Sequence, residues 1–111
     1  MHEVHKLIIP LLERPDHPTA FFAGNDMLCF GIYSAAHTCS MRIPEDISIV
    51  GYDDIPTSSL MQPPLTTFWQ PEQELAKASV DYLINQIQHK TIEPPPRLRG
   101  KIIERKSVAK I

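Results

Sequence analysis

The hydrophobic positions along the chain follow two periodicities. Apolar residues recur at helical spacing in three segments, residues 3–13, 25–40 and 71–89. Four short segments have the apolar character of strands: residues 19–24, 47–50, 65–69 and 100–107. Because strands and helices alternate, the pattern predicts an α/β fold with a parallel sheet. The second strand is mostly apolar, which predicts burial on both of its faces.

The predicted helices carry apolar stripes that need partners. In the second helix the stripe is expected to be Leu28, Ile32, Ala35 and Ala36. In the third helix it is expected to be Ala76, Val80, Leu83 and Ile87. The second helix should begin with Asn25 or Asp26 as its cap, since both side chains accept hydrogen bonds from free backbone N–H groups.

Polar residues follow two of the predicted strands. Asn25 and Asp26 come after the first strand, and Asp53 and Asp54 come after the second. A single crossover helix joins these strands, so Asn25 and Asp53 are expected to meet at the carboxyl edge, where parallel sheets bind ligands. An amide with a carboxylate suits a polyhydroxylated or amine-bearing small molecule. The alternative is that these residues only cap the helix and form turns.

Composition narrows the class of protein. The chain has 111 residues, and 11 basic against 13 acidic side chains give a net charge of −2, which argues against a dominant nucleic-acid surface. No apolar run approaches a membrane span, and no signal peptide is visible. Cys29 and Cys39 would lie about 15 Å apart along one helix, too far for a disulfide, so we expect free thiols and a cytoplasmic location.

No metal or cofactor is expected. His2 and His5 are spaced to share a helix face, but no third ligand lies near them in the sequence. They are more simply explained as a solvated helix start.

Four stretches, taken in order and spacing, resemble the C-terminal part of the LacI/GalR family of bacterial transcription regulators. They are "PTAFFAGNDMLCFGIYSAA", "RIPEDISIVGYDDIP", "PPLTTFWQP" and "RKSVA". The resemblance runs from about Pro18 to Ala109. It implies an incomplete type I periplasmic-binding-protein-like domain, represented here by its parallel-sheet, three-layer lobe. It also implies a homodimer that binds a small-molecule effector between two lobes and DNA through an N-terminal helix-turn-helix.

The family's effector-binding residues match positions of this chain. Its asparagine corresponds to Asn25 in "GND", and its aspartate corresponds to Asp53, the first of "YDD". A further contact falls near Gln70, and Trp69 beside it offers a stacking platform. Some sugar-binding members carry an aromatic residue where this chain has Glu72, so stacking at that position is not expected.

The resemblance also assigns a dimer interface and a division of the chain. The interface positions include Phe30 and Met61. Residues 1–70 and 97–111 correspond to the C-terminal lobe. Residues 71–96, a helix and a proline-rich segment, cross to the N-terminal lobe in the family. The family's DNA-binding segment and most of the N-terminal lobe have no counterpart here, so we expect the stripe of the third helix to fold back on its own lobe or to pack on another copy.

One departure from the family concerns Ser40. The family usually has a glycine there, at the end of the second helix, where a left-handed backbone is common. Serine must adopt that conformation at some cost or end the helix differently.

Three functions are compatible with these residues. The preferred one is the effector-binding and dimerisation region of a repressor, which responds to a sugar or related metabolite and is not an enzyme. The alternatives are a sugar-binding protein of a transporter with the same fold, and a phospho-acceptor or Mg²⁺-dependent enzyme using the paired carboxylates. The last would need a lysine at a strand end, and the sequence places none there.

Overall fold

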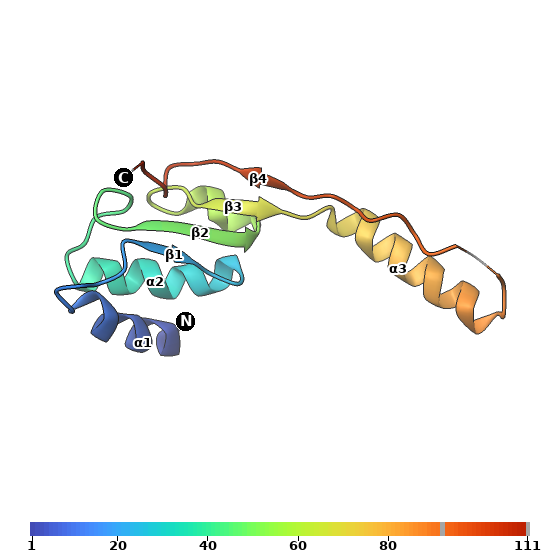
Figure 1. Ribbon diagram of the computed structural model, residues 1–111, viewed down its shortest axis with the longest axis horizontal. Coiled ribbons are helices and arrows are strands. Elements are labelled where there is room, and N and C mark those ends of the chain that lie inside the picture. Colours follow the sequence, from blue (N-terminus) through green and yellow to red (C-terminus); the bar gives the residue numbers. More distant parts are fainter. Residues whose placement is uncertain (92, 111) are drawn as a thin grey trace. The chain divides into compact units, whose positions relative to one another are not determined.

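The computed structural model describes residues 1–91 and 93–110 of the chain. The elements are α1 (His2–Leu12), β1 (Ala20–Phe22), α2 (Asp26–Thr38), β2 (Ser48–Asp53), the 3₁₀ helix η1 (Pro56–Leu60), β3 (Thr66–Trp69), α3 (Glu72–Ile87) and β4 (Lys101–Ile103) (Figure 1). This order confirms the predicted α/β alternation, and η1 lies between the second and third predicted strands. None of the helices in the described residues has the length and apolarity required to cross a bilayer.

The strands form one sheet in the order β1-β2-β3-β4. β1 pairs with β2, and β2 with β3, both in parallel, which confirms the predicted parallel arrangement. Phe22 lies opposite Val50, and Asp53 lies opposite Trp69. The carboxyl ends of these three strands therefore lie at the same edge of the sheet.

The chain divides into two compact units. The first contains Met1–Trp69 and the residues from Ile102 onward, and the second contains Gln70–Lys101. In the second unit no residue of α3 is buried, and Val80, Leu83 and Ile87 are exposed. The expectation that this stripe packs on the chain's own lobe or on another copy stays a prediction. The assignment of the segment to an N-terminal lobe also stays a prediction.

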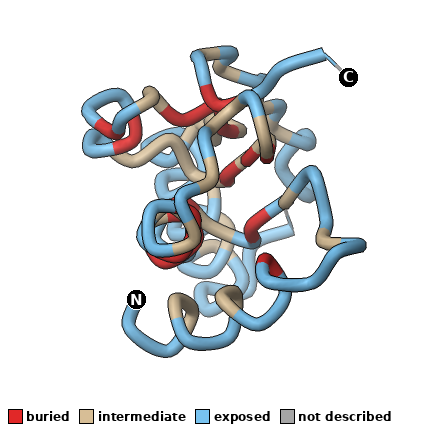
Figure 2. The backbone as a smooth tube through the Cα atoms, turned by 90° about the vertical axis from the view of Figure 1, so that its left-hand side faces the viewer, coloured by how far each residue is buried: buried red, intermediate tan, exposed pale blue. Residues whose placement is uncertain are grey.

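The core of the first unit lies between α2 and the sheet (Figure 2). α2 buries Ile32, Ala35 and Ala36 as predicted, but Leu28 is exposed and Cys29 is buried in its place. β2 alternates between buried and half-buried residues, so the prediction that both faces are buried is wrong. α2 packs on β2 and covers one face of this strand, and the residues of the other face are half-buried.

α1 packs on the outer side of α2 at a glycine. A Cβ atom placed on Gly31 would come within 2.6 Å of Val4 Cβ and 3.0 Å of the Met1 carbonyl oxygen. Any larger residue at position 31 would therefore push α1 away from α2. Leu12, at the other end of α1, is fully buried in the core.

Ser40 ends α2 in the left-handed conformation, with φ of 55°. Its N–H group donates to the His37 carbonyl oxygen at 3.1 Å, and the N–H group of Met41 donates to the Ala36 carbonyl oxygen at 2.9 Å. This pair of bonds is the Schellman motif, in which the left-handed position is usually glycine. The sequence left two possibilities, a left-handed serine or a different end of the helix. The structure shows the left-handed serine.

We predict that Ser40→Gly stabilises the chain. Glycine removes the clash of Cβ with the backbone, although it adds entropy to the unfolded chain, so the net gain should be about 0.5–1 kcal/mol. Urea unfolding monitored by circular dichroism measures this difference. As a control, Ser34→Gly makes the same change inside α2, where it should cost about 0.5 kcal/mol. A destabilised Ser40→Gly variant would contradict this account.

Candidate functional site

The predicted ligand residues lie at the carboxyl edge of the sheet. Asn25 lies three positions beyond Phe22, and Asp53 lies three positions beyond Val50, the register partner of Phe22. Trp69 lies opposite Asp53 at the end of β3. The topology thus brings Asn25, Asp53 and Trp69 to one edge, which the sequence predicted for Asn25 and Asp53. Gln70 belongs to the second unit.

Asn25 caps α2, which confirms that one residue of the Asn25-Asp26 pair has this role. Its side-chain oxygen accepts a hydrogen bond from the Leu28 N–H group at 3.0 Å. The cap occupies the oxygen and leaves the amide nitrogen of this half-buried side chain available as a donor. Capping and ligand binding are therefore compatible at Asn25, with the side chain already held by the helix.

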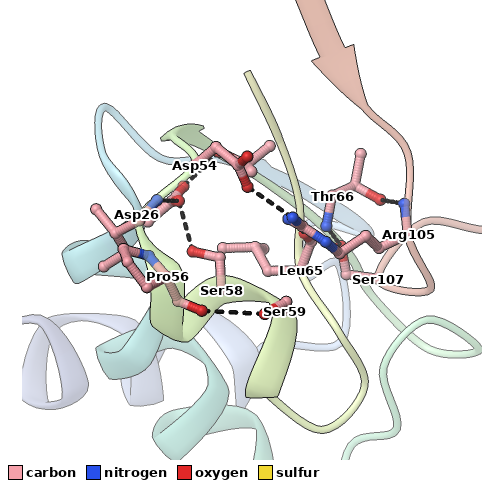
Figure 3. Close-up of polar contacts among 11 residues, drawn as sticks. Asp26, Asp54, Pro56, Ser58, Ser59, Leu65, Thr66, Arg105 and Ser107 are labelled. Carbon is pink, nitrogen blue, oxygen red and sulfur yellow. Dashed lines mark hydrogen bonds and ion pairs between the residues drawn. The ribbon is translucent and has the colours of Figure 1, made fainter. Parts of the chain in front are cut away.

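Asp26 has a role that the sequence pattern did not predict. Its carboxylate is fully buried and accepts three hydrogen bonds: from Thr67 Oγ1 at 2.5 Å, from Ser58 Oγ at 2.5 Å and from the Ile55 N–H group at 3.0 Å (Figure 3). A buried carboxylate is tolerated only when it is fully hydrogen-bonded. Asp26 therefore joins the start of α2 to β3 and to the segment that follows Asp54.

Gly51 leaves the room that Asp26 occupies. A Cβ atom at position 51 would clash with Asp26 Oδ1 and would lie 3.0 Å from Leu65 Cδ2. The glycine in the middle of β2 is thus explained by the close approach of a carboxylate. The available sequence signal for the buried site was this glycine inside a strand, with "SS" and "TT" downstream.

Cys29 lies one turn into α2 and is fully buried. Burial, with a smaller contribution from the charge of Asp26, raises the pKa of its thiol to about 12. Both cysteines are free, as predicted. A thiol with so high a pKa is not a nucleophile at neutral pH.

Asp53 and Asp54 both have a left-handed backbone, with φ of 108° and 54°. Asp54 was predicted to be a turn residue, and the structure shows more. Its carboxylate accepts a hydrogen bond from Arg105 Nη2 at 2.7 Å, and both side chains are mostly buried. Asp54 therefore forms an ion pair in addition to turning the chain.

The segment after β4 forms hydrogen bonds with β2 and with residues at the start of β3. Arg105 donates from Nη1 to the Leu65 carbonyl oxygen at 2.8 Å and from its backbone N–H to Thr66 Oγ1 at 2.9 Å (Figure 3). Ser107 Oγ accepts from the Thr66 N–H group at 2.8 Å and donates to the Ile49 carbonyl oxygen at 2.5 Å. These contacts explain the "RKS" of the resemblance, whose role the sequence alone did not assign.

The predicted interface residues differ in exposure. Phe30 is half-buried and packs in part against the core. Met61 is only 7% exposed and belongs to the core, whereas Leu60 beside it is 75% exposed. The outward apolar surface at this place is therefore Leu60 rather than Met61. Among the described residues, no group of three or more His, Cys, Asp or Glu side chains is placed to hold a metal ion.

Comparison with known proteins identifies the family. The model of the periplasmic binding protein-like domain matches residues 2–108. The chain belongs to this family. It is 43% identical over 83 residues to the ribose operon repressor of Escherichia coli K12, covering 75% of the chain and 25% of that protein. It is 37% identical over 107 residues to the transcriptional repressor PurR of Aliivibrio salmonicida, covering 96% of the chain and 32% of that protein.

Solved structures agree with this assignment. The lac repressor dimer bound to operator and the anti-inducer ONPF matches with a TM-score of 0.86 and 31% identity, over 98% of this chain and 38% of that one. A LacI family regulator from Enterococcus faecium with bound ribose matches with a TM-score of 0.84 and 34% identity. The match covers 99% of this chain and 41% of that one. These matches confirm the resemblance to the LacI/GalR family and the type I fold. The chain spans a quarter to a third of the length of the curated relatives named here.

We predict that Ser58→Ala destabilises the chain and that Ser59→Ala does not. Ser58 is fully buried and donates to Asp26, so its loss should cost about 1.5–3 kcal/mol, the usual range for a hydrogen bond to a charged group. Ser59 donates to the Pro56 carbonyl oxygen at an exposed position and should cost less than about 0.5 kcal/mol. Urea unfolding of both variants measures the difference. Equal effects would show that Asp26 does not depend on Ser58.

Proposed function

We propose that this chain is the effector-binding and dimerisation region of a LacI/GalR-type transcription repressor. The observation that carries the proposal is the placement of Asn25 and Asp53 at equivalent positions on one carboxyl edge of a parallel sheet. These residues match the family's ligand positions, and the relatives named above are repressors. Trp69 completes the edge in the first unit, and Gln70 follows it at the start of the second.

The effector we propose is a sugar, with D-ribose as the first candidate. One relative is a ribose operon repressor, and a similar structure contains ribose. The donor of Asn25 and the acceptors of Asp53 complement adjacent hydroxyl groups, which both donate and accept hydrogen bonds. A carboxylate that accepts from such hydroxyls discriminates strongly against ligands that lack them.

The mechanism we propose is a shift between arrangements of the two lobes that the resemblance assigns to the complete protein. An effector that contacts both lobes binds one arrangement better and so raises its population. By linkage, the arrangement that binds effector sets the affinity for operator DNA. Asp53 and Asn25 supply the share of that difference in affinity that comes from the lobe containing this sheet.

We propose that the protein acts in the cytoplasm, in keeping with its free cysteines. A sugar-binding protein of a transporter is the second candidate, because it would share the fold. The two are distinguished by operator DNA, since only a repressor binds it in an effector-dependent manner.

We predict that Asp53→Ala weakens effector binding tenfold or more. Loss of a charged hydrogen-bond partner costs about 1.5–3 kcal/mol, which corresponds to about tenfold or more in the dissociation constant. The experiment uses the protein produced from the complete reading frame that encodes these residues, called here the complete gene product. Thermal shift first screens it with sugars, sugar phosphates and nucleobases. Calorimetry with the ligand found then compares the variants.

The matched control is Asp16→Ala, which removes an exposed aspartate paired with Arg14. It should leave the dissociation constant unchanged. An unchanged constant for Asp53→Ala would remove Asp53 from the site. Failure of every sugar in the screen would overturn the proposed class of effector.

We also propose that a homodimer forms through Phe30 of α2 and the segment around Leu60. Met61, proposed from the resemblance, would act by supporting Leu60 from the core. An unpaired aspartate buried in such an interface loses its hydration and destabilises the dimer. We therefore predict that Phe30→Asp and Leu60→Asp lower the dimer fraction of the complete gene product in sedimentation experiments. Leu7→Asp, at an exposed leucine of α1, is the control, and an unchanged dimer in the first two variants would refute this interface.

A further inference from the structure

We propose that Asp54 and Arg105 are positioning residues, whose ion pair holds the backbone of Asp53 in the left-handed region and so orients the Asp53 side chain toward its ligand. This inference rests on the proposed ligand role of Asp53. The contact of Asp54 with Arg105 is shown by the structure. The link from that contact to ligand binding is what we infer.

The conformation of Asp53 needs support from its neighbours. Its φ of 108° lies in a region that residues with a Cβ atom rarely adopt, and φ of the next residue is also positive. Two consecutive unfavourable residues persist only where the surrounding structure determines them. Such backbone conformations gather at ligand sites, because they aim a side chain in a direction that a regular strand would not.

Two contacts fix the chain on the downstream side of Asp53. The Asp54 carboxylate accepts from Arg105 Nη2 at 2.7 Å, and the Ile55 N–H group donates to the buried Asp26 carboxylate at 3.0 Å (Figure 3). Upstream, Asp53 is in register with Trp69 in β3. The peptide units around Asp53 are thus anchored on both sides, and the Asp53 backbone has little freedom to relax.

Arg105 is itself held in place. Its second guanidinium nitrogen donates to the Leu65 carbonyl oxygen at 2.8 Å, and its backbone N–H donates to Thr66 Oγ1 at 2.9 Å. A guanidinium that is held by a backbone carbonyl, in a residue whose own backbone is also held, is a well-oriented donor for a carboxylate. Arg105 therefore connects Asp54 to Leu65 and Thr66 at the start of β3. Asp54 is one residue from Asp53, the proposed ligand contact.

This ion pair differs from three others in the described part of the chain. The Arg14–Asp16, Arg42–Asp46 and Lys77–Asp81 pairs join residues at most four positions apart, and each contains a side chain more than 50% exposed. Asp54 and Arg105 are 51 positions apart, and their side chains are 16% and 19% exposed. Exposed pairs contribute little, whereas a largely buried pair with several hydrogen bonds restricts conformation.

The test combines a backbone measurement with ligand binding. Three variants of the 111-residue chain are compared. Asp54→Asn removes the negative charge of the carboxylate, and Arg105→Met removes the guanidinium donor. Arg105→Lys keeps the positive charge but lacks the forked pair of guanidinium nitrogens. NMR reports φ of Asp53 through the intraresidue HN–Hα NOE and its coupling constant. In the complete gene product, calorimetry with D-ribose gives the dissociation constant. Arg42→Met, which breaks an exposed pair, is the matched control.

We expect Asp54→Asn and Arg105→Met to reduce the positive-φ signal of Asp53 and to weaken D-ribose binding tenfold or more. Arg105→Lys should keep part of the positive-φ signal and part of the affinity for D-ribose. If Arg105→Met does not fold, Arg105→Lys and Asp54→Asn still provide the test. In an Asp53→Ala background, Asp54→Asn should cause no further loss of affinity, because it acts through Asp53. A merely structural role would lower affinity equally in both backgrounds.

The outcomes separate this inference from the proposed function. If Asp53 keeps its positive φ in the variants and their losses of affinity add to that of Asp53→Ala, the positioning role is overturned while ribose binding stands. If the unmodified protein does not bind D-ribose, the proposed ligand fails. The NMR measurement then decides by itself whether Asp54 and Arg105 hold the Asp53 backbone.

Discussion

The first unit of this protein depends on one buried carboxylate. Asp26, at the start of α2, accepts hydrogen bonds from Thr67 in β3, from Ser58 in η1 and from the Ile55 N–H group. Desolvating a charge is costly unless its hydrogen bonds are complete, so all three partners must be in place together. This requirement fixes the first helical turn of α2 relative to β3 and to the loop after β2, with Gly51 providing the space.

The candidate ligand edge is built on that arrangement. Asn25 precedes Asp26 and is held by its cap on α2, while Asp53 lies two residues before Ile55. Arg105, from the end of the chain, adds a second anchor at Asp54. Side chains supported in this way are oriented before a ligand arrives, which reduces the entropy lost on binding. Beside this edge, burial raises the pKa of the Cys29 thiol to about 12, so the thiol is protonated at neutral pH.

Membership of the periplasmic binding protein-like family gives this edge a context. The similar structures include a repressor dimer bound to operator and an anti-inducer, and a regulator with bound ribose. The exposed stripe of α3 fits a chain that spans only part of such proteins.

The sequence by itself determined the order of elements, the parallel sheet and the meeting of Asn25 with Asp53 at one edge, because local periodicity and strand order carry that information. The sequence also showed that Ser40 must either adopt a left-handed conformation or end α2 differently, and the structure shows the left-handed conformation. Only the tertiary structure decided which carboxylate is buried, that Cys29 rather than Leu28 faces the core, that one face of β2 is half-buried and that Met61 is internal while Leu60 is exposed. These outcomes depend on contacts between residues far apart in the chain, such as Asp54 with Arg105 and Asp26 with Thr67, and no local pattern encodes such pairs.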